Sequence, residues 1–102
     1  MENKQQELQT KLEELLGSRN VYYQPPESLK MQYPAIRYEL STIQSNNADN
    51  IKYSKNNRYQ ITVIDRLPDN EVISKILDLP YTSYDRRYKA NNLNHDVITI
   101  YY

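Results

Sequence analysis

The alternation of side chains in residues 59–64 most limits what this chain of 102 residues can fold into. Tyr59, Ile61 and Val63 occupy every second position, so they share one face of an extended segment. Residues 36–40 repeat the pattern, with apolar and charged side chains in alternation. Both segments therefore predict β-strands, and we expect a sheet at the centre of the fold.

Residues 3–16 have the spacing of an amphipathic helix. Four leucines fall on one helix face, namely Leu8, Leu12, Leu15 and Leu16. Gly17, the single glycine of the chain, follows where a left-handed C-terminal cap is expected. The pattern predicts an N-terminal helix within residues 1–17.

A second, shorter helix is expected after residue 70. Asp69 or Asn70 can accept hydrogen bonds from the free amides at its start, and Glu71 suits the dipole of its first turn. The apolar stripe that follows has helical spacing and consists of Val72, Ile73, Ile76 and Leu77. This helix has to end before Pro80.

Further extended segments are expected on either side of these elements. Residues 21–23 form a short one, and Pro25 and Pro26 then begin a surface connection. The last part of the chain predicts a hairpin with strands in 81–89 and 97–102 and a turn over 90–94. We place its apolar second strand at a sheet edge, where it can pair with a neighbouring subunit.

Residues 44–57 are almost entirely polar and rich in asparagine. They predict a long loop or a protruding hairpin tip between two strands, and loops of this length are usually functional or flexible. Both interpretations stay open. The expected fold is a single α+β domain over residues 1–102. It has a mixed or antiparallel sheet, the two helices packed on that sheet, and this protruding hairpin loop.

Charge and hydropathy exclude several classes of protein. Thirteen basic residues balance thirteen acidic ones, so net charge provides no attraction to nucleic acid or anionic lipid. No apolar run approaches the roughly 18–20 residues of a membrane span, and the N-terminus lacks the apolar centre of a signal peptide. We expect neither a membrane partner nor specific nucleic-acid binding.

Residues with catalytic or ligand-binding chemistry are scarce. One glycine, one histidine and no cysteine exclude a glycine-rich phosphate loop, a thiolate zinc site and a serine elbow with its histidine. His95 and Asp96 could form an acid–base pair near Asp85. The favoured interpretation is a turn histidine bonded to a carboxylate or to the backbone. We expect no catalytic residue, no cofactor, no metal site and no enzymatic activity.

Tyrosine is the aromatic residue of this chain, with eleven copies and neither phenylalanine nor tryptophan. Tyrosine suits protein interfaces because its apolar ring carries a hydroxyl group. An ordinary strand composition explains the excess equally well.

Two segments, 52–55 and 84–89, also interleave basic and aromatic residues, as single-strand-binding proteins do. Alternation would place Tyr84, Arg86 and Tyr88 on one face, although contacts within the sheet are the favoured interpretation.

Several segments, taken in order, resemble the tail terminator, or tail-completion, proteins of long-tailed bacteriophages. They are VYYQPPE (21–27), YPAIRYE (33–39), ADN (48–50), RYQITVIDR (58–66), PD (68–69), LPY (79–81) and LNHDV through YY (93–102). The resemblance covers about residues 20–102, and the N-terminal helix is similar only in kind.

The resemblance implies a small mixed α/β fold and assembly into a ring, usually of six subunits, at the head-proximal end of the tail tube. Such a ring caps the tube, stops its polymerisation and joins the tail to the head. The expected partners are further copies of the chain, the tail-tube protein and a head-completion or connector protein. The expected location is the virion neck, reached after assembly in the host cytoplasm, with genomic DNA at most passing through the ring.

Two alternatives stay open. The short chain also suits a head-completion (stopper or adaptor) protein of the same neck, and a small single-stranded nucleic-acid-binding module is the alternative of another class. A ring with head-to-tail contacts needs two different surfaces on each subunit. The residues expected at such interfaces are Asn47, Asp49, Asn50, Lys52, Tyr53, Lys55, Tyr84, Arg86, Tyr88, Tyr101 and Tyr102.

Overall fold

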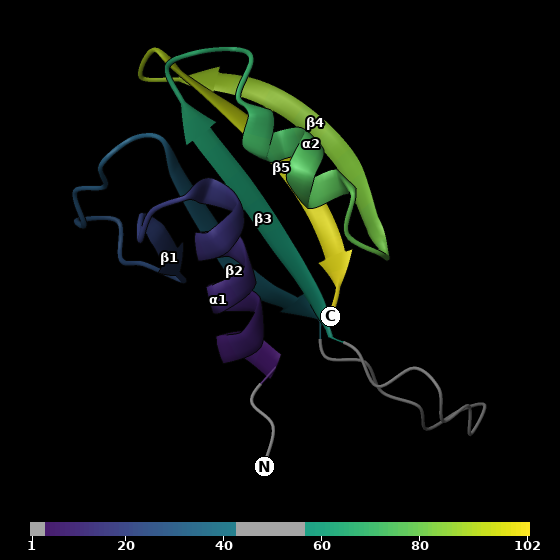
Figure 1. The fold of residues 1–102 in the computed structure, drawn as a ribbon. Helices are drawn as coiled ribbons and strands as arrows, with labels where there is room; N and C mark the ends of the chain where they lie inside the picture. Colours follow the sequence, from purple (N-terminus) through teal and green to yellow (C-terminus); the bar gives the residue numbers. More distant parts are fainter. Residues whose placement is uncertain (1–3, 43–56) are drawn as a thin grey trace, which may run out of the picture.

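The computed structural model describes residues 4–42 and 57–102. Its elements follow the order α1 (Lys4–Leu16), β1 (Val21–Tyr23), β2 (Ala35–Thr42), β3 (Arg58–Asp65), α2 (Glu71–Leu77), β4 (Thr82–Ala90) and β5 (Leu93–Tyr101) (Figure 1). This arrangement confirms a single α+β domain with a helix at its N-terminal end. The loop predicted for residues 44–57 lies outside the described residues, apart from Asn57.

The five strands form one mixed sheet in the order β1-β2-β3-β5-β4. Strand β1 pairs with β2 in parallel, and the other neighbouring strands pair antiparallel. Because β5 lies between β3 and β4, the prediction that the last strand forms a sheet edge is wrong. Val97 and Ile98 point to opposite faces of β5 and are each at most 1% exposed, which suits an interior strand.

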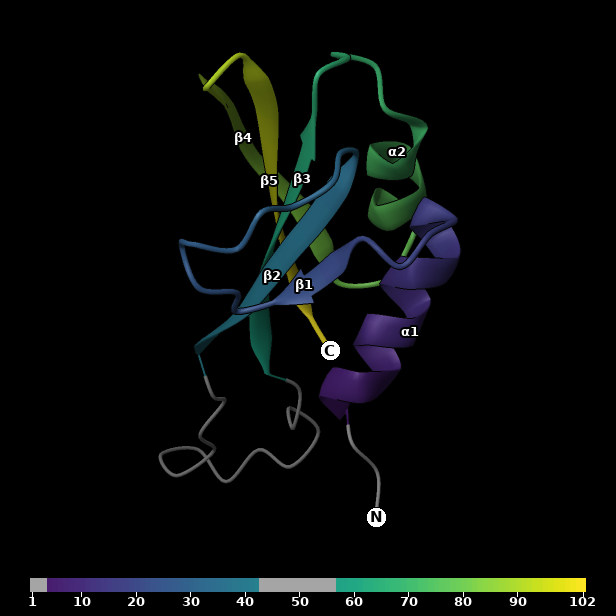
Figure 2. The same cartoon turned by 90° about the vertical axis from the view of Figure 1, so that its left-hand side faces the viewer.

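Both helices pack on the same face of the sheet (Figure 2). Leu8 and Leu12 of α1 and Val72 and Ile76 of α2 are buried there. They contact a layer of sheet side chains made of Val21, Ile36, Tyr38, Tyr59, Ile61, Val63, Ile98 and Ile100. Each fully buried side chain of this size contributes roughly 1.5–3 kcal/mol. This layer is therefore the main source of stability.

The helix ends follow the local signals in the sequence. Gly17 has φ +81°, and its N–H donates to the Glu13 carbonyl at 2.8 Å, which confirms the predicted left-handed cap. Asn70 caps α2, since its side-chain oxygen accepts from the Val72 N–H at 2.9 Å. Leu77 is the last residue of α2, three before Pro80, as expected.

The hairpin turn is shorter than predicted. Asn91 and Asn92, with φ of +53° and +62°, form a two-residue connection between β4 and β5. Two positive φ angles match the right-handed twist of a tight hairpin, and asparagine accepts them better than most residues. The strands therefore continue to Ala90 and from Leu93, inside the span predicted as a turn.

Candidate assembly surfaces

Strand β4 is a long edge of the sheet. Among the described strands it pairs only with β5, and its residues 83–89 are all exposed. The opposite edge, β1, is only three residues long, and the Gln9 side chain of α1 donates to its Val21 carbonyl at 2.9 Å. Edge strands present unpaired backbone groups. The longer such surface is therefore the β4 edge, which we define as residues 82–90.

A β-bulge divides β4. Tyr84 lies opposite Ile98 and Arg86 lies opposite Val97, so Asp85 is an extra residue in the ladder. The Asp85 carboxylate accepts a hydrogen bond from the Thr99 hydroxyl at 2.8 Å. The extra residue reverses the alternation beyond it. The prediction that Tyr84, Arg86 and Tyr88 share one face is therefore wrong.

On the helix side of the sheet, Tyr84 and Arg87 both bind Asp96. The Tyr84 hydroxyl donates to Asp96 Oδ1 at 2.5 Å, and Arg87 Nε donates to the same oxygen at 2.8 Å. Arg87 Nη2 also donates to the Pro68 carbonyl at 2.6 Å. The hydrogen bond to Asp96 raises the pKa of Tyr84. This cluster fastens β4 to β5 and to the connection before α2.

On the uncovered side, Tyr88 stacks on His95. Their ring centroids are 4.7 Å apart with an interplanar angle of 15°, and the Arg86 guanidinium lies 5.7 Å from the Tyr88 centroid. His95 Nδ1 lies 3.1 Å from the Leu93 carbonyl. His95 belongs to β5 rather than to a turn, and it faces away from Asp96. The two residues do not form the acid–base pair considered above.

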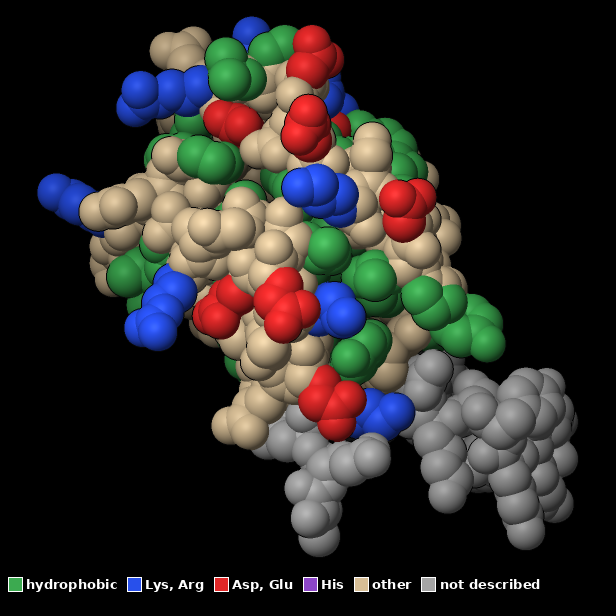
Figure 3. Space-filling model, viewed as in Figure 1, with side chains coloured by type: hydrophobic (Ala, Val, Ile, Leu, Met, Phe, Trp, Pro, Cys, Tyr) green, Lys and Arg blue, Asp and Glu red, His purple; other side chains and the backbone are tan. Residues whose placement is uncertain are grey.

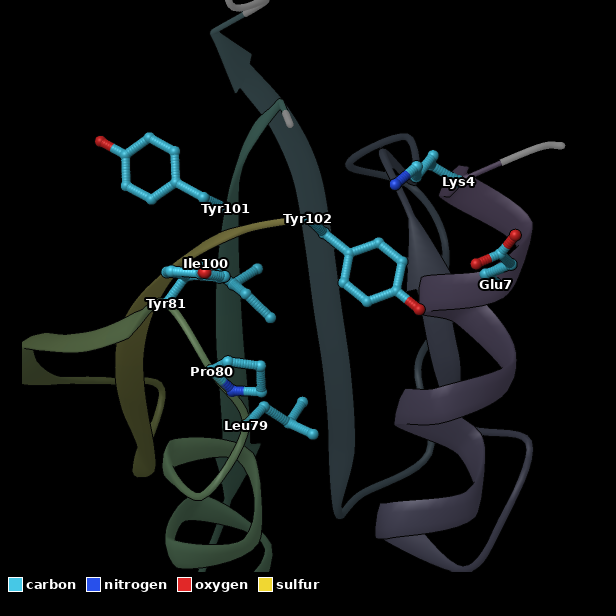
Figure 4. A pocket seen from close by; sticks show the side chains of 8 residues that line it. All are labelled: Lys4, Glu7, Leu79, Pro80, Tyr81, Ile100, Tyr101 and Tyr102. Atoms are coloured by element: carbon cyan, nitrogen blue, oxygen red, sulfur yellow. The ribbon is translucent and has the colours of Figure 1, made fainter. Parts of the chain in front are cut away.

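A groove lies where α1, the α2–β4 connection and β5 meet (Figure 4). We call it the terminal groove, and its volume is about 230 Å³. Its lining consists of Lys4, Glu7, Leu79, Pro80, Tyr81, Ile100, Tyr101 and Tyr102. In Figure 3, hydrophobic side chains gather over this region, between α1 and the start of β4.

The three tyrosines of the terminal groove lie differently. Tyr102 points toward α1, where the Lys4 ammonium is 6.0 Å from its ring centroid, and burial raises its pKa (Figure 4). Tyr101 points away from Tyr102 and is 38% exposed. Tyr81 is 72% exposed and has φ +63°, which is unusual for a bulky residue. The groove therefore combines two exposed rings with a third that closes one wall.

The structure groups the expected interface residues unevenly. Tyr84, Arg86 and Tyr88 lie on the β4 edge, and Tyr101 and Tyr102 line the terminal groove. Asn47, Asp49, Asn50, Lys52, Tyr53 and Lys55 lie outside the described residues.

Sequence reasoning missed Tyr81 and Arg87 as surface residues. The adjacent arginines at 86 and 87 were a signal for Arg87, because neighbouring residues on a strand face opposite sides. Nothing in the sequence indicates the positive φ of Tyr81, because tyrosine rarely adopts it.

No helix in the described part of the chain is long and apolar enough to cross a membrane. Residues 4–42 and 57–102 contain no cluster of histidine, aspartate and glutamate that could hold a metal ion. No protein-family model matches the chain, and comparisons with curated proteins and with solved structures give no match.

Proposed function

We propose that this protein is a structural virion protein of a long-tailed bacteriophage. In this proposal it forms a ring, of six subunits as in the family it resembles, at the head-proximal end of the tail tube. The ring ends tube polymerisation and joins the tail to the head-completion protein. Its action is binding without bond chemistry, so it requires no cofactor or metal. It acts at the virion neck after assembly in the host cytoplasm.

The observation that carries the proposal is the presence of two unlike exposed surfaces on one small domain. The terminal groove offers tyrosine rings beside an apolar wall, and the β4 edge offers unpaired backbone with basic side chains. Contacts between the subunits of a head-to-tail ring need different complementary surfaces, and a ring that joins two other proteins needs further surfaces for them. Exposed tyrosines are the residue type that protein interfaces favour. The small α+β fold also agrees with the fold that the resemblance implies.

The direct test is tube capping in vitro. Purified tail-tube subunits are polymerised with and without this protein and imaged by negative-stain electron microscopy. We expect tubes that stop growing and carry a ring at one end. The same assay with Tyr81→Ala and Tyr101→Ala, against the exposed control Glu14→Gln on the outer face of α1, asks whether the terminal groove is used. Tubes that grow on uncapped would contradict termination and favour the head-completion role.

A second candidate function rests on the stack of Arg86, Tyr88 and His95. The exposed Tyr88 ring, stacked on the half-buried His95 and beside the Arg86 guanidinium, lies on the side of the sheet without helices and can accept a nucleobase by stacking. Titration with a single-stranded oligonucleotide at two salt concentrations tests it. Salt-sensitive binding that Tyr88→Ala abolishes and Tyr84→Ala preserves would support this function, because Tyr84 lies on the opposite face.

A further inference from the structure

We infer that the β4 edge is a strand-addition site for an extended, acidic segment of a different protein. The inference concerns this edge alone and does not depend on ring formation or on tube capping. It follows from the direction of the backbone groups, the charges along the edge and the side chains that flank it.

The hairpin register shows which backbone groups are free. Ala90 and Leu93 flank a two-residue turn, and such a flanking pair is a hydrogen-bonded pair. Hydrogen-bonded and non-hydrogen-bonded pairs alternate along an antiparallel ladder. Lys89 and Arg87 therefore form the non-hydrogen-bonded pairs with β5. Their N–H and C=O groups point away from the sheet, where an added strand would bind.

The charge on the edge selects an acidic occupant. The edge carries Arg86, Arg87 and Lys89 against Asp85, which is three positive charges and one negative, a net charge of +2. In the described residues the one ion pair joins Arg87 to Asp96, and Asp85 is bonded to Thr99. Within residues 4–42 and 57–102, Arg86 and Lys89 therefore have no carboxylate partner. An incoming strand with glutamate or aspartate at every second position would place carboxylates on one face, beside Lys89 on the helix side or beside Arg86 on the other side.

The same charges disfavour a second copy of β4 as the occupant. When two β4 edges pair antiparallel over their regular residues 86–90, Arg87 and Lys89 lie opposite each other. Like charges directly opposite one another destabilise a strand pair. The described part of the chain also offers no acidic strand with a free edge, because β1 contains only Val21, Tyr22 and Tyr23.

Exposed tyrosines flank the edge on both faces of the sheet. Tyr84 is 44% exposed on the helix side, and Tyr88 is 37% exposed on the uncovered side. Successive side chains of an added strand point to opposite faces, so a strand paired with residues 86–90 would meet Tyr88 on one face, and it would meet Tyr84 on the other face only if it continued past the bulge. The bulge at Asp85 limits the regular ladder to residues 86–90, and we expect a short partner segment.

The test uses the whole protein and a synthetic nine-residue peptide, Thr-Glu-Val-Glu-Thr-Glu-Val-Glu-Thr. Its control replaces each glutamate with lysine. We expect the acidic peptide to bind and to slow hydrogen exchange of the Lys89 and Arg87 amides, measured by NMR. The lysine peptide should bind at least about tenfold more weakly. No binding of the acidic peptide up to about 1 mM, or equal binding of both peptides, would overturn the inference.

Two substitutions of Lys89 separate the contribution of its backbone N–H to peptide binding from the contribution of its side-chain charge. Lys89→Pro removes the outward N–H without breaking a bond to β5 and should weaken binding about tenfold. Lys89→Ala removes only the side chain, and a loss of about two- to threefold is expected. Equal affinity of both variants would contradict strand addition.

Thermal unfolding shows whether Lys89→Pro stays folded. The exchange of the wild-type Lys89 amide tests the same contact without any variant. Self-association of the wild type through this amide would overturn the choice of a different protein as partner. Tube capping is a separate measurement, so its failure would leave this result unchanged.

Discussion

The Tyr38 hydroxyl donates to the Gln9 side-chain oxygen at 2.5 Å, joining the middle of the sheet to α1. Gln5 donates to the same hydroxyl at 2.6 Å, and Gln9 also binds the β1 carbonyl of Val21. One buried tyrosine and two glutamines therefore fix where the helix lies on the sheet. A phenylalanine ring would fill the same space without fixing this position.

Tyr38→Phe should lower the free energy of unfolding by about 1 kcal/mol. The substitution keeps the buried ring but removes the hydroxyl bonds to α1, and a typical hydrogen bond contributes this amount. Urea denaturation followed by circular dichroism measures the change. Glu14→Gln, on the exposed face of the same helix, is the matched control and should stay within about 0.5 kcal/mol of the wild type. A neutral Tyr38→Phe would show that the hydroxyl does not contribute.

Alkaline pH should destabilise the fold. Burial raises the pKa of Tyr38 to about 12 from its ordinary value of 10.0. The folded state therefore holds a proton that the unfolded state releases. Its contribution is fully present below pH 10 and is lost as the pH rises through about 12. Urea midpoints at pH 8, 10 and 11 should fall, and Tyr38→Phe should flatten the fall. The pH-dependent loss of stability that remains in the Tyr38→Phe variant reflects the raised pKa of Tyr59, Tyr84 and Tyr102.

Asp96→Ala should destabilise the domain far more than Asp85→Ala. The Asp96 carboxylate is buried and accepts bonds from Tyr84 and Arg87, whose donors would lose their partner. Asp85 lies on the same hairpin but is exposed and accepts one bond from Thr99. Thermal unfolding of the two variants checks this, and equal losses would contradict the role given to Asp96.

The turn residue Asn92 should accept glycine but not alanine. At φ +62° most side chains destabilise the backbone by about 1 kcal/mol, because their Cβ is close to a carbonyl oxygen. Glycine has no Cβ, and asparagine tolerates this conformation better than most residues. Asn92→Gly should therefore match or exceed the stability of the wild type, and Asn92→Ala should lose about 1 kcal/mol. Denaturant midpoints distinguish the two, and the reverse order would rule out the two-residue turn.

Tyr81→Gly should reduce tube capping while leaving the free energy of unfolding nearly unchanged. Glycine relieves the positive φ, and the exposed ring contributes little burial. The variant should therefore stay within about 0.5 kcal/mol of the wild type. If the terminal groove binds a neighbour or the tube, tube capping should fall at least about tenfold while Tyr81→Phe retains it. Full capping by the glycine variant would exclude Tyr81 from the interface.

The features that could be predicted from the sequence are those that depend on neighbouring residues in the chain. The alternation around Ile61, the leucine spacing of α1 and the caps at Gly17 and Asn70 are readable because their partners lie within a few residues. The position of β5 and the bulge at Asp85 depend on distant strands, which a local pattern does not contain. Adjacent apolar side chains such as Val97 and Ile98 indicate a strand that is buried on both faces, which favours an interior position over an edge.

The candidate site was less predictable than the fold. The tyrosines at 84, 88, 101 and 102 were singled out by residue type, because aromatic residues are common at interfaces. Their division between two surfaces depends on the bulge and on how α1 meets β5. The contact of Arg87 with Asp96 depends on the register of the hairpin, although the adjacent arginines at 86 and 87 indicate that one of them faces each side. The positive φ of Tyr81 has no local sequence signal.

The interior position of β5 also affects how the protein is made. During synthesis, β3 has β2 as its partner but lacks its second neighbour until Leu93–Tyr101 has left the ribosome. Until then the apolar side chains of β3 and the edge of that strand stay open to other nascent chains. The sheet therefore closes late, and a chaperone that shields β3 would matter most in that interval.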